Sequence, residues 1–256
     1  TLCGSTRFKD AFFEAQKRLT LEGNIVISVG LFGHSGDREV WEGMAVRTDS
    51  EKVKLSRQFV LQLMLAHHTV RCLSCSKSGD CDLQKLAVEL ELPTVEANPY
   101  EADTAKLPAR TDNPFLAYYP ELCIGCQRCV SVCSRRVGNG VLNASKIGTR
   151  TYIEAPFGPD WKNTDCELCG NCASVCPTGA LVAKNMGKYQ TGNVNRVLTT
   201  CPHCATGCQF YLMVKDNTIV DVHPADGPSN KGLLCVKGRF GSFNFVHSPD
   251  RLRHQL

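Results

Sequence analysis

Residues 123–133 form the sequence CIGCQRCVSVC, and residues 166–176 repeat its cysteine spacing as CELCGNCASVC. In each run three cysteines lie three positions apart, and a fourth follows four positions later. Three thiolates at this spacing can wrap one face of a cubane, while the fourth reaches the other cluster of a pair. The repeat therefore predicts a domain that holds two [4Fe–4S] clusters.

Each predicted ligand set joins both runs, because the fourth cysteine of a run crosses over. Zinc is the alternative metal, but its sites favour separated C-x2-C pairs over triplets. Ser134 stands where a proline usually follows such a run, whereas Pro177 follows the second run. The pair nevertheless resembles a bacterial two-cluster ferredoxin. The first set is Cys123, Cys126, Cys129 and Cys176, and the second is Cys166, Cys169, Cys172 and Cys133.

The sixteen cysteines in 256 residues far exceed ordinary usage and indicate disulfides, zinc or iron–sulfur clusters. Disulfide scaffolds are usually short secreted chains, whereas this chain is long and shows no hydrophobic signal segment. Its longest mostly apolar stretch, Phe59 to Ala66, is too short to cross a bilayer. We therefore expect reduced, metal-binding cysteines in the cytoplasm.

The formal charge of +4 does not indicate a nucleic-acid partner. Thiolate-bound iron–sulfur clusters are negatively charged, so four loaded sites would make the net charge negative. The basic side chains are also dispersed rather than gathered in one patch. We expect no nucleic acid among the partners.

Two further ligand sets flank the ferredoxin pair. In the upstream set the neutral imidazole of His68 would replace one of four thiolates, which alters the charge and potential of the cluster. His67 could also be proposed there, and a zinc site with three cysteines and one histidine is the rival. Zinc is likewise an alternative for the downstream set. The upstream set is His68, Cys72, Cys75 and Cys81, and the downstream set is Cys201, Cys204, Cys208 and Cys235.

The hydrophobic patterns predict an α+β fold, with several small domains that include a two-cluster ferredoxin-like domain and a small antiparallel-sheet cluster domain. One helix is expected to carry an apolar stripe that packs in the core, and another to be capped by Asp82. The stripe comprises Val53, Phe59, Val60, Leu63 and Met64. Helices are expected over Arg7–Leu21, Asp49–His68 and Asp82–Leu92, a buried strand over Asn24–Gly30, a linker or covering loop over Pro93–Pro120, and a hairpin over Gln209–Val222 that turns at Asp216-Asn217.

From about Gly43 onward, the order of the four sets resembles the N-terminal half of cytosolic molybdenum- or tungsten-dependent formate dehydrogenases. The large iron–sulfur subunit of respiratory complex I and the N-terminal region of [FeFe]-hydrogenases share the earlier part. In these families the segment from Glu42-Gly43-Met44 to Thr48-Asp49-Ser50 closes a [2Fe–2S] domain. The resemblance includes His68 and the residues Gly79-Asp80-Cys81-Asp82-Leu83-Gln84, and it implies a histidine-ligated [4Fe–4S] cluster.

The downstream set distinguishes between these families. The active-site cysteine motifs of a hydrogenase are absent from the sequence. The two parts of the downstream set, Cys201-Pro202-x-Cys204-x3-Cys208 and Leu234-Cys235-Val236-Lys237-Gly238-Arg239, look like the cluster-binding start of a molybdopterin oxidoreductase. In that family the lysine at the Lys237 position lies between the cluster and the pterin and helps to conduct electrons. Lys237 is otherwise a solvated side chain after a turn.

The sequence ends at Leu256, where the pterin-binding domains would begin, so we expect no pterin pocket and no formate oxidation by this chain alone. The predicted organisation has four segments. They are an atypical segment that replaces or retains part of a [2Fe–2S] domain (1–50), a histidine-ligated cluster domain (51–110), a two-cluster ferredoxin domain (111–195) and a molybdopterin-oxidoreductase-type cluster domain (196–256).

The N-terminal segment departs from the formate dehydrogenase pattern. Thr1-Leu2-Cys3 looks like the first ligand motif of the [2Fe–2S] domain, but no other cysteine precedes Cys72. From Cys3 to Asp37 the sequence resembles the start of a nucleoside 2-deoxyribosyltransferase-like protein. This stretch of roughly 40 residues is too short to build that α/β fold or its glycosyl-transfer site, so no separate activity is expected. We predict no [2Fe–2S] cluster in this chain, which makes Cys3 a free thiol or a ligand of an intermolecular cluster.

These observations predict an iron–sulfur electron-transfer subunit, or the relay part, of a formate dehydrogenase-like complex. Four [4Fe–4S] clusters would connect a molybdopterin site, in a partner or a further C-terminal part, with a flavin/NAD-binding, ferredoxin or hydrogenase subunit. Alternatively, the sequence is the N-terminal part of a full formate dehydrogenase catalytic subunit, and a zinc-stabilised interaction module is a third hypothesis. One-electron transfer needs no acid, base or nucleophile, so no catalytic residue is assigned.

Overall fold

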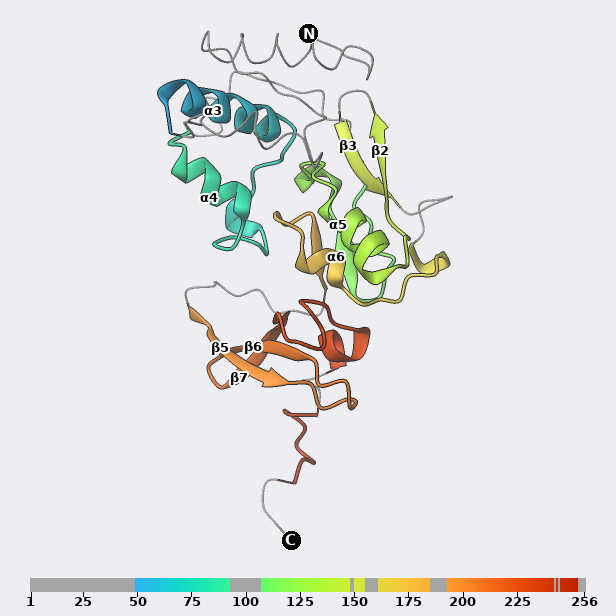
Figure 1. Ribbon diagram of the computed structural model, residues 1–256. Coiled ribbons are helices and arrows are strands. Elements are labelled where there is room, and N and C mark those ends of the chain that lie inside the picture. Colours follow the sequence, from blue (N-terminus) through green and yellow to red (C-terminus); the bar gives the residue numbers. More distant parts are fainter. Residues whose placement is uncertain are drawn as a thin grey trace, which may run out of the picture. The chain divides into compact units, whose positions relative to one another are not determined.

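A computed structural model describes residues 49–92, 107–147, 150–154, 161–184, 193–241, 243 and 245–252. The chain divides into two compact units, Thr1–Ser50 and Glu51–Leu256. The expected helix at Arg7–Leu21 and strand at Asn24–Gly30 lie outside the described residues, as does Cys3. The second unit, coloured in Figure 1, contains all four predicted ligand sets.

The first two helices of this unit confirm two sequence predictions. Helix α3 (Glu51–Ala66) and helix α4 (Asp82–Glu89) form where hydrophobic periodicity placed them (Figure 1). The two helices meet through Leu61, Leu83 and Leu90, which form one buried cluster. A 3-10 turn at Cys72–Ser74 lies between them and carries the first cysteine of the upstream set.

The interpretation of the α3 stripe as core packing is wrong for most of its members. Phe59 is 47% exposed and Val60 is 50% exposed, and Leu63 and Met64 are exposed as well. Only Leu61 of α3 is buried. A helix packed through a single line of side chains buries a narrower face than the apolar pattern offers.

The predicted cap of α4 is also wrong. Cys81, rather than Asp82, occupies the N-cap position, and no side chain caps the helix. Asp82 lies in the first turn, where a carboxylate favours the helix dipole, and it forms a salt bridge of 3.1 Å with Arg128.

The ferredoxin-like part is built from short elements that return on one another. Strand β1 (Leu116–Tyr118) pairs with β4 (Leu181–Ala183), and β2 (Asn143–Ile147) pairs with β3 (Arg150–Glu154), both antiparallel. The remaining elements are α5 (Arg128–Ser131), a π-helical turn (Val132–Val137), α6 (Asn171–Ser174), and 3-10 turns at Pro120–Leu122 and Trp161–Asn163.

Strand β1 corrects the prediction of a linker or covering loop over Pro93–Pro120. Residues 93–106 lie outside the described residues, but Leu116, Ala117 and Tyr118 are each at most 2% exposed. The strand closes the domain because its partner, β4, follows the second cysteine run. Proline spacing did not reveal this burial, since the pairing partner is distant in sequence.

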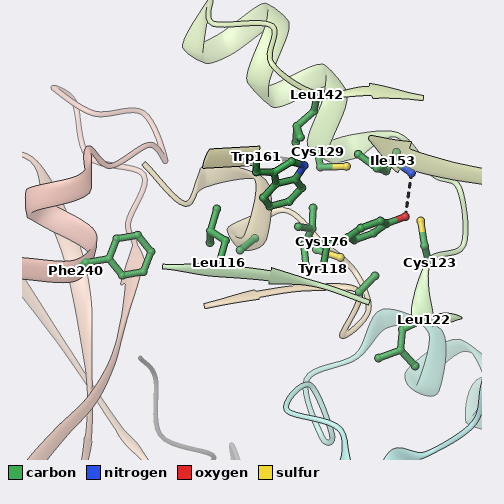
Figure 2. Close-up of a cluster of buried hydrophobic side chains, with 13 residues drawn as sticks. Leu116, Tyr118, Leu122, Cys123, Cys129, Leu142, Ile153, Trp161, Cys176 and Phe240 are labelled. Atoms are coloured by element: carbon green, nitrogen blue, oxygen red, sulfur yellow. Dashed lines mark hydrogen bonds between the residues drawn. The ribbon is translucent and has the colours of Figure 1, made fainter. Parts of the chain in front are cut away.

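A hydrophobic core that includes Tyr118 contains cysteines of both runs (Figure 2). The Tyr118 ring stacks near Trp161, with ring centroids 6.2 Å apart. Its hydroxyl accepts a hydrogen bond of 2.9 Å from the backbone N–H of Ile153, drawn as the dashed line in Figure 2. This bond ties β3 to the core and satisfies a buried donor.

The C-terminal part is a three-stranded antiparallel sheet in the order β5 (Asn195–Thr200), β6 (Gln209–Lys215), β7 (Thr218–Pro224). The predicted hairpin is confirmed, and Asp216 and Asn217 both have positive φ, as a tight hairpin turn requires. A π-helical turn at Lys237–Gly241 follows the sheet. These small sheets and helices confirm the α+β class. Among the described residues, no helix has the length and apolar character needed to cross a bilayer.

Replacement of Tyr118 by phenylalanine tests the role of its hydroxyl in the core. Tyr118→Phe leaves the buried Ile153 N–H without its acceptor, which should cost about 1–3 kcal/mol. We expect the apparent unfolding temperature to fall by several degrees in anaerobic thermal melts. Tyr119→Phe is the matched control, because the ring contact of Tyr119 with Arg71 survives the change. Equal apparent unfolding temperatures of the two variants would contradict a stabilising role of the Tyr118 hydroxyl.

Candidate metal centres

The first predicted set is gathered around one cavity. Its empty volume is about 310 Å³, and Tyr118, Ile153 and Thr178 contribute to its wall. Figure 2 shows three of the cysteines beside the Tyr118 core. Burial, followed by the charges of Cys176, Cys123 and Cys126, raises the pKa of Cys129 to about 12. The four cysteines that line this cavity are Cys123, Cys126, Cys129 and Cys176.

This grouping brings a cysteine of the second run to the first run, as the crossover pattern predicts. Cys129 lies in helix α5, whereas Cys176 follows helix α6. The raised pKa means that the buried thiol is protonated at neutral pH, so metal binding must release its proton. A soft thiolate set of this kind suits iron–sulfur clusters or zinc.

The second predicted set lines a separate cavity with an empty volume of about 450 Å³. Leu142, Trp161 and Asn171 contribute to its wall. Burial, then the charges of Cys169, Cys129, Cys166 and Cys133, raises the pKa of Cys172 well above its usual value. Because Cys129 belongs to the first set, the two sets adjoin each other. The cysteines in the wall are Cys133, Cys166, Cys169 and Cys172.

The three cysteines of the upstream set are electrostatic neighbours. Burial raises the pKa of Cys81, the backbone N–H groups of Gln84 and Leu83 oppose that effect, and Cys75 and Cys72 raise it further. The amides belong to the first turn of α4, so the helix N-terminus faces the Cys81 sulfur. These amides offset part of the effect of burial, although the pKa of Cys81 stays above its usual value.

The two histidines that the sequence left as alternatives have different surroundings. His68 lies just beyond α3, and its Nδ1 forms a hydrogen bond of 3.1 Å with the carbonyl oxygen of Leu122. Metal-binding histidines commonly donate their second ring N–H to such a carbonyl, which leaves Nε2 as the ligating nitrogen. His67 instead faces a cavity with Cys123 and Gly125. The geometry therefore favours His68.

The Leu122 carbonyl also connects the upstream set with the first ferredoxin set. Thr178 Oγ1 donates a hydrogen bond of 2.8 Å to it and lies 3.8 Å from Cys176 Sγ. Close packing supports the junction, because a Cβ at Gly179 would lie 2.5 Å from Cys75 Sγ. The backbone N–H of Asp82 also bonds to Pro177 O at 2.9 Å. The upstream loop thus rests on the segment that follows Cys176.

The downstream set is the most exposed of the four, since Cys204 and Cys235 both face solvent. Burial, then the charges of Cys201, Cys204 and Cys235, raises the pKa of Cys208. The first three cysteines lie in the segment that joins β5 to β6, and the Cys201 N–H donates a hydrogen bond of 2.8 Å to Cys208 O across it. A Cβ at Gly238 would lie 3.7 Å from Cys201 Sγ and 3.9 Å from Cys235 Sγ.

Lys237 is an exposed residue at the start of the last π-helical turn. The hydroxyl and backbone N–H of Thr206, and then the charge of Lys237, lower the pKa of Cys204. The ammonium group is therefore close enough to act on a cysteine of the downstream set. This placement is consistent with the role that the family resemblance implies.

Within the part of the chain that the structure describes, no three His, Cys, Asp or Glu side chains are close enough to bind a single metal ion. A zinc ion would hold its sulfur ligands at about 2.3 Å. The structure gathers all four cysteines of each ferredoxin set around one cavity, and it brings together the three cysteines of the upstream set. Sequence reasoning missed the side chains between the sets, above all Asn171 and Thr178, because no spacing rule indicates contacts with distant backbone.

Three protein families match successive parts of the chain. The NADH-ubiquinone oxidoreductase-G iron–sulfur binding region matches residues 57–96. The 4Fe–4S dicluster domain matches residues 122–180. The molybdopterin oxidoreductase Fe4S4 domain matches residues 194–247.

Similar proteins come from several bacteria. NADPH-Fe(3+) oxidoreductase subunit alpha of Geobacter sulfurreducens is 37% identical over 220 residues, which cover 85% of this chain and 25% of that protein. The G 2 subunit of NADH-quinone oxidoreductase from Rhizobium meliloti is 31% identical over 84% of this chain and 25% of its own length. A formate dehydrogenase-like protein of Staphylococcus haemolyticus is 26% identical over 83% of this chain and 25% of its own length. The chain thus spans about a quarter of the length of these relatives.

The fold, the cysteine sets and the family matches define an iron–sulfur electron-transfer protein with [4Fe–4S] domains. More particularly, the chain carries the iron–sulfur region related to the G-type subunits of NADH-quinone oxidoreductase, the alpha subunit of NADPH-Fe(3+) oxidoreductase and formate dehydrogenase-like proteins. The resemblance seen in the sequence is confirmed for residues 57–96, 122–180 and 194–247.

Replacement of each histidine separates the two candidate ligands. His68→Ala should lower the iron content by about four atoms per chain, because a cubane would lose one of its four protein ligands. His67→Ala should leave the iron content unchanged. Iron and sulfide analysis of anaerobically purified protein measures both. Loss of iron from the His67 variant alone would reverse the assignment.

Replacement of the fourth cysteines tests the crossover. Cys176→Ala should remove the cluster of the first run, with about four irons, and leave the cluster held by Cys166, Cys169 and Cys172. Cys133→Ala should have the reciprocal effect. Electron paramagnetic resonance of the reduced variants distinguishes the two remaining signals, and Cys3→Ala is the control. If Cys176→Ala abolished the signal of its own run instead, the crossover would be wrong.

Proposed function

We propose that this chain relays single electrons through four [4Fe–4S] clusters in a formate dehydrogenase-like complex. When bound, each such cluster accepts and releases one electron. The ligands would be the four sets described above, in segments 51–110, 111–195 and 196–256. Residues 1–50 would form an atypical N-terminal segment without a [2Fe–2S] cluster.

The observation that carries this proposal is the exchange of cysteines between the two runs. Cys176 joins the cavity of the first run, and Cys133 joins that of the second. Because the charge of Cys129 also acts on Cys172, the two sites are neighbours. A pair of adjoining thiolate sites suits one-electron transfer between them, whereas a structural zinc site would need no such neighbour.

The outer sets support an order of electron-transfer sites along the chain, with the upstream set at one end and the downstream set at the other. His68 would be held as a ligand by the Leu122 carbonyl, and the same carbonyl leads through Thr178 to Cys176. At the other end, the exposed Cys235 and Lys237 would meet a molybdopterin site. That site would belong to a partner or to a further C-terminal part.

At its upstream end the relay would exchange electrons with a partner. That partner would be a subunit that binds flavin and NAD, a ferredoxin or a hydrogenase subunit. The names of two relatives include NADPH and NADH, which supports a nicotinamide-linked partner for this chain as well. We place the complex in the cytoplasm, in keeping with reduced cysteine ligands.

One observation favours a second candidate function. Because the chain spans about a quarter of its relatives, it is alternatively the N-terminal part of a longer catalytic subunit. That subunit would oxidise formate and pass two electrons, one at a time, to the same four clusters, or reduce carbon dioxide with two electrons received from them. Bound pterin in protein purified from the native source would favour this candidate.

Metal analysis tests the proposed relay most directly. Protein purified without oxygen should contain about sixteen irons and as much sulfide per chain, since each of four cubanes holds four irons. The reduced protein should show magnetically coupled signals from the adjoining ferredoxin pair. Iron, sulfide and zinc assays with electron paramagnetic resonance supply these measurements.

Two results would change the proposal. About twelve irons and one zinc would assign a structural role to the upstream or downstream set. Zinc without sulfide would remove electron transfer and leave the zinc-stabilised interaction module as the function.

A further inference from the structure

A buried amide side chain forms two hydrogen bonds between the ferredoxin-like part and the C-terminal part. Asn171 is 3% exposed and lies between Cys169 and Cys172 of the second set. Its Nδ2 donates a hydrogen bond of 2.9 Å to the backbone carbonyl of Leu234, and its Oδ1 accepts one of 3.0 Å from the Leu234 N–H. Leu234 directly precedes Cys235, the last cysteine of the downstream set.

The two hydrogen bonds between Asn171 and Leu234, called the clamp below, lie in closely packed surroundings. Gly170 has a φ of +73°, and a Cβ there would lie 2.9 Å from both Arg239 Cδ and Phe240 Cζ. Arg239 Nη1 donates a hydrogen bond to Ser174 Oγ. The Phe240 ring stacks on Phe115, with centroids 4.6 Å apart. The segment after Cys235 thus packs closely against Gly170, Ser174 and Phe115 of the ferredoxin-like part.

We infer that Asn171 is the positioning residue that sets the separation between the second ferredoxin cluster and the downstream cluster. This inference rests on the proposed relay. The amide reaches the backbone next to Cys235 from a position next to Cys172, so the clamp joins two ligand loops directly. One electron would leave one cluster and enter the other, and no bond would form or break.

An amide is suited to this role because it donates and accepts at once. A buried residue that lacks either function leaves one Leu234 backbone group unsatisfied, which pushes the loops apart or admits water. Another bond between the same two parts, from Arg136 Nη2 to the Lys231 carbonyl at 2.7 Å, is exposed. Water can replace an exposed partner, so that bond carries little of the positioning.

Two variants of the full chain test this inference against a matched control. Asn171→Leu removes both bonds of the clamp, and Asn171→Asp retains only the acceptor for the Leu234 N–H. Arg136→Ala removes the exposed bond between the same two parts. Hydrogen exchange at the Leu234 amide measures the clamp with or without clusters, and pulsed electron paramagnetic resonance measures the interaction between the two reduced clusters.

In Asn171→Leu we expect the Leu234 amide to exchange about tenfold faster, as the loss of one buried hydrogen bond implies. The magnetic interaction should weaken and electron exchange between the two clusters should slow about tenfold, while iron content stays at the wild-type value. Asn171→Asp should retain slow exchange at Leu234 but show a weakened magnetic interaction. Arg136→Ala should match wild type in every measurement.

Unchanged magnetic interaction and electron exchange in both iron-loaded Asn171 variants would overturn the inference. If Asn171→Leu fails to load, the loaded Asn171→Asp variant decides the question by the same criterion. If the wild-type protein itself contains no iron, that result refutes the proposed relay and, with it, a role of Asn171 in positioning two clusters. Exchange at Leu234 then still shows whether the clamp holds the two loops together, so the two failures are distinguishable.

Discussion

The exchange of one cysteine between two runs is the constraint on which the rest of the structure depends. Each cavity of the ferredoxin-like part takes three thiols from one run and one from the other. Neither run can complete its set alone, so the chain between them must return closely enough to bring Cys176 to Cys129. The pairing of β1 with β4 and the core around Tyr118 supply that return. The packing of this part therefore brings the two runs into the arrangement that both cavities require.

Burial has opposite effects on the free thiols and on the loaded site. It raises the pKa of Cys129 and Cys172, which favours the protonated, metal-free form. The same exclusion of water strengthens the electrostatic interactions of a bound cluster with its thiolates and nearby amides. Metal binding in this part of the chain would therefore have to release protons from buried thiols.

The ends of the unit differ from its centre in exposure and in the way they attach. The upstream loop rests on the Leu122 carbonyl and on the segment after Cys176, while the downstream loop is clamped by Asn171. Both attachments use backbone groups adjacent to cysteines, so they can fix distances between sites without adding ligands. Cys235 and Lys237 are both exposed, so the downstream loop faces solvent.

The sequence alone predicted the α+β class and the two ferredoxin sets that line the two cavities, because the repeated cysteine spacing is typical of a cluster pair. It also located α3, α4 and the β6–β7 hairpin, whose signals are local. It failed for β1 and for the exposed face of α3, since each depends on which distant segments pack there. It also misplaced the cap of α4, because the helix begins one residue earlier than a cap at Asp82 requires.

Only the tertiary structure decided which histidine bonds to Leu122 and how the cluster domains are joined. Asn171 and Leu234 are 63 positions apart, and nothing in the composition of either segment indicates their hydrogen bonds. A ligand motif is a local property of the chain, whereas the distance between two motifs is set by packing. That physical difference explains why the candidate sites were predictable from sequence and the connections between them were not.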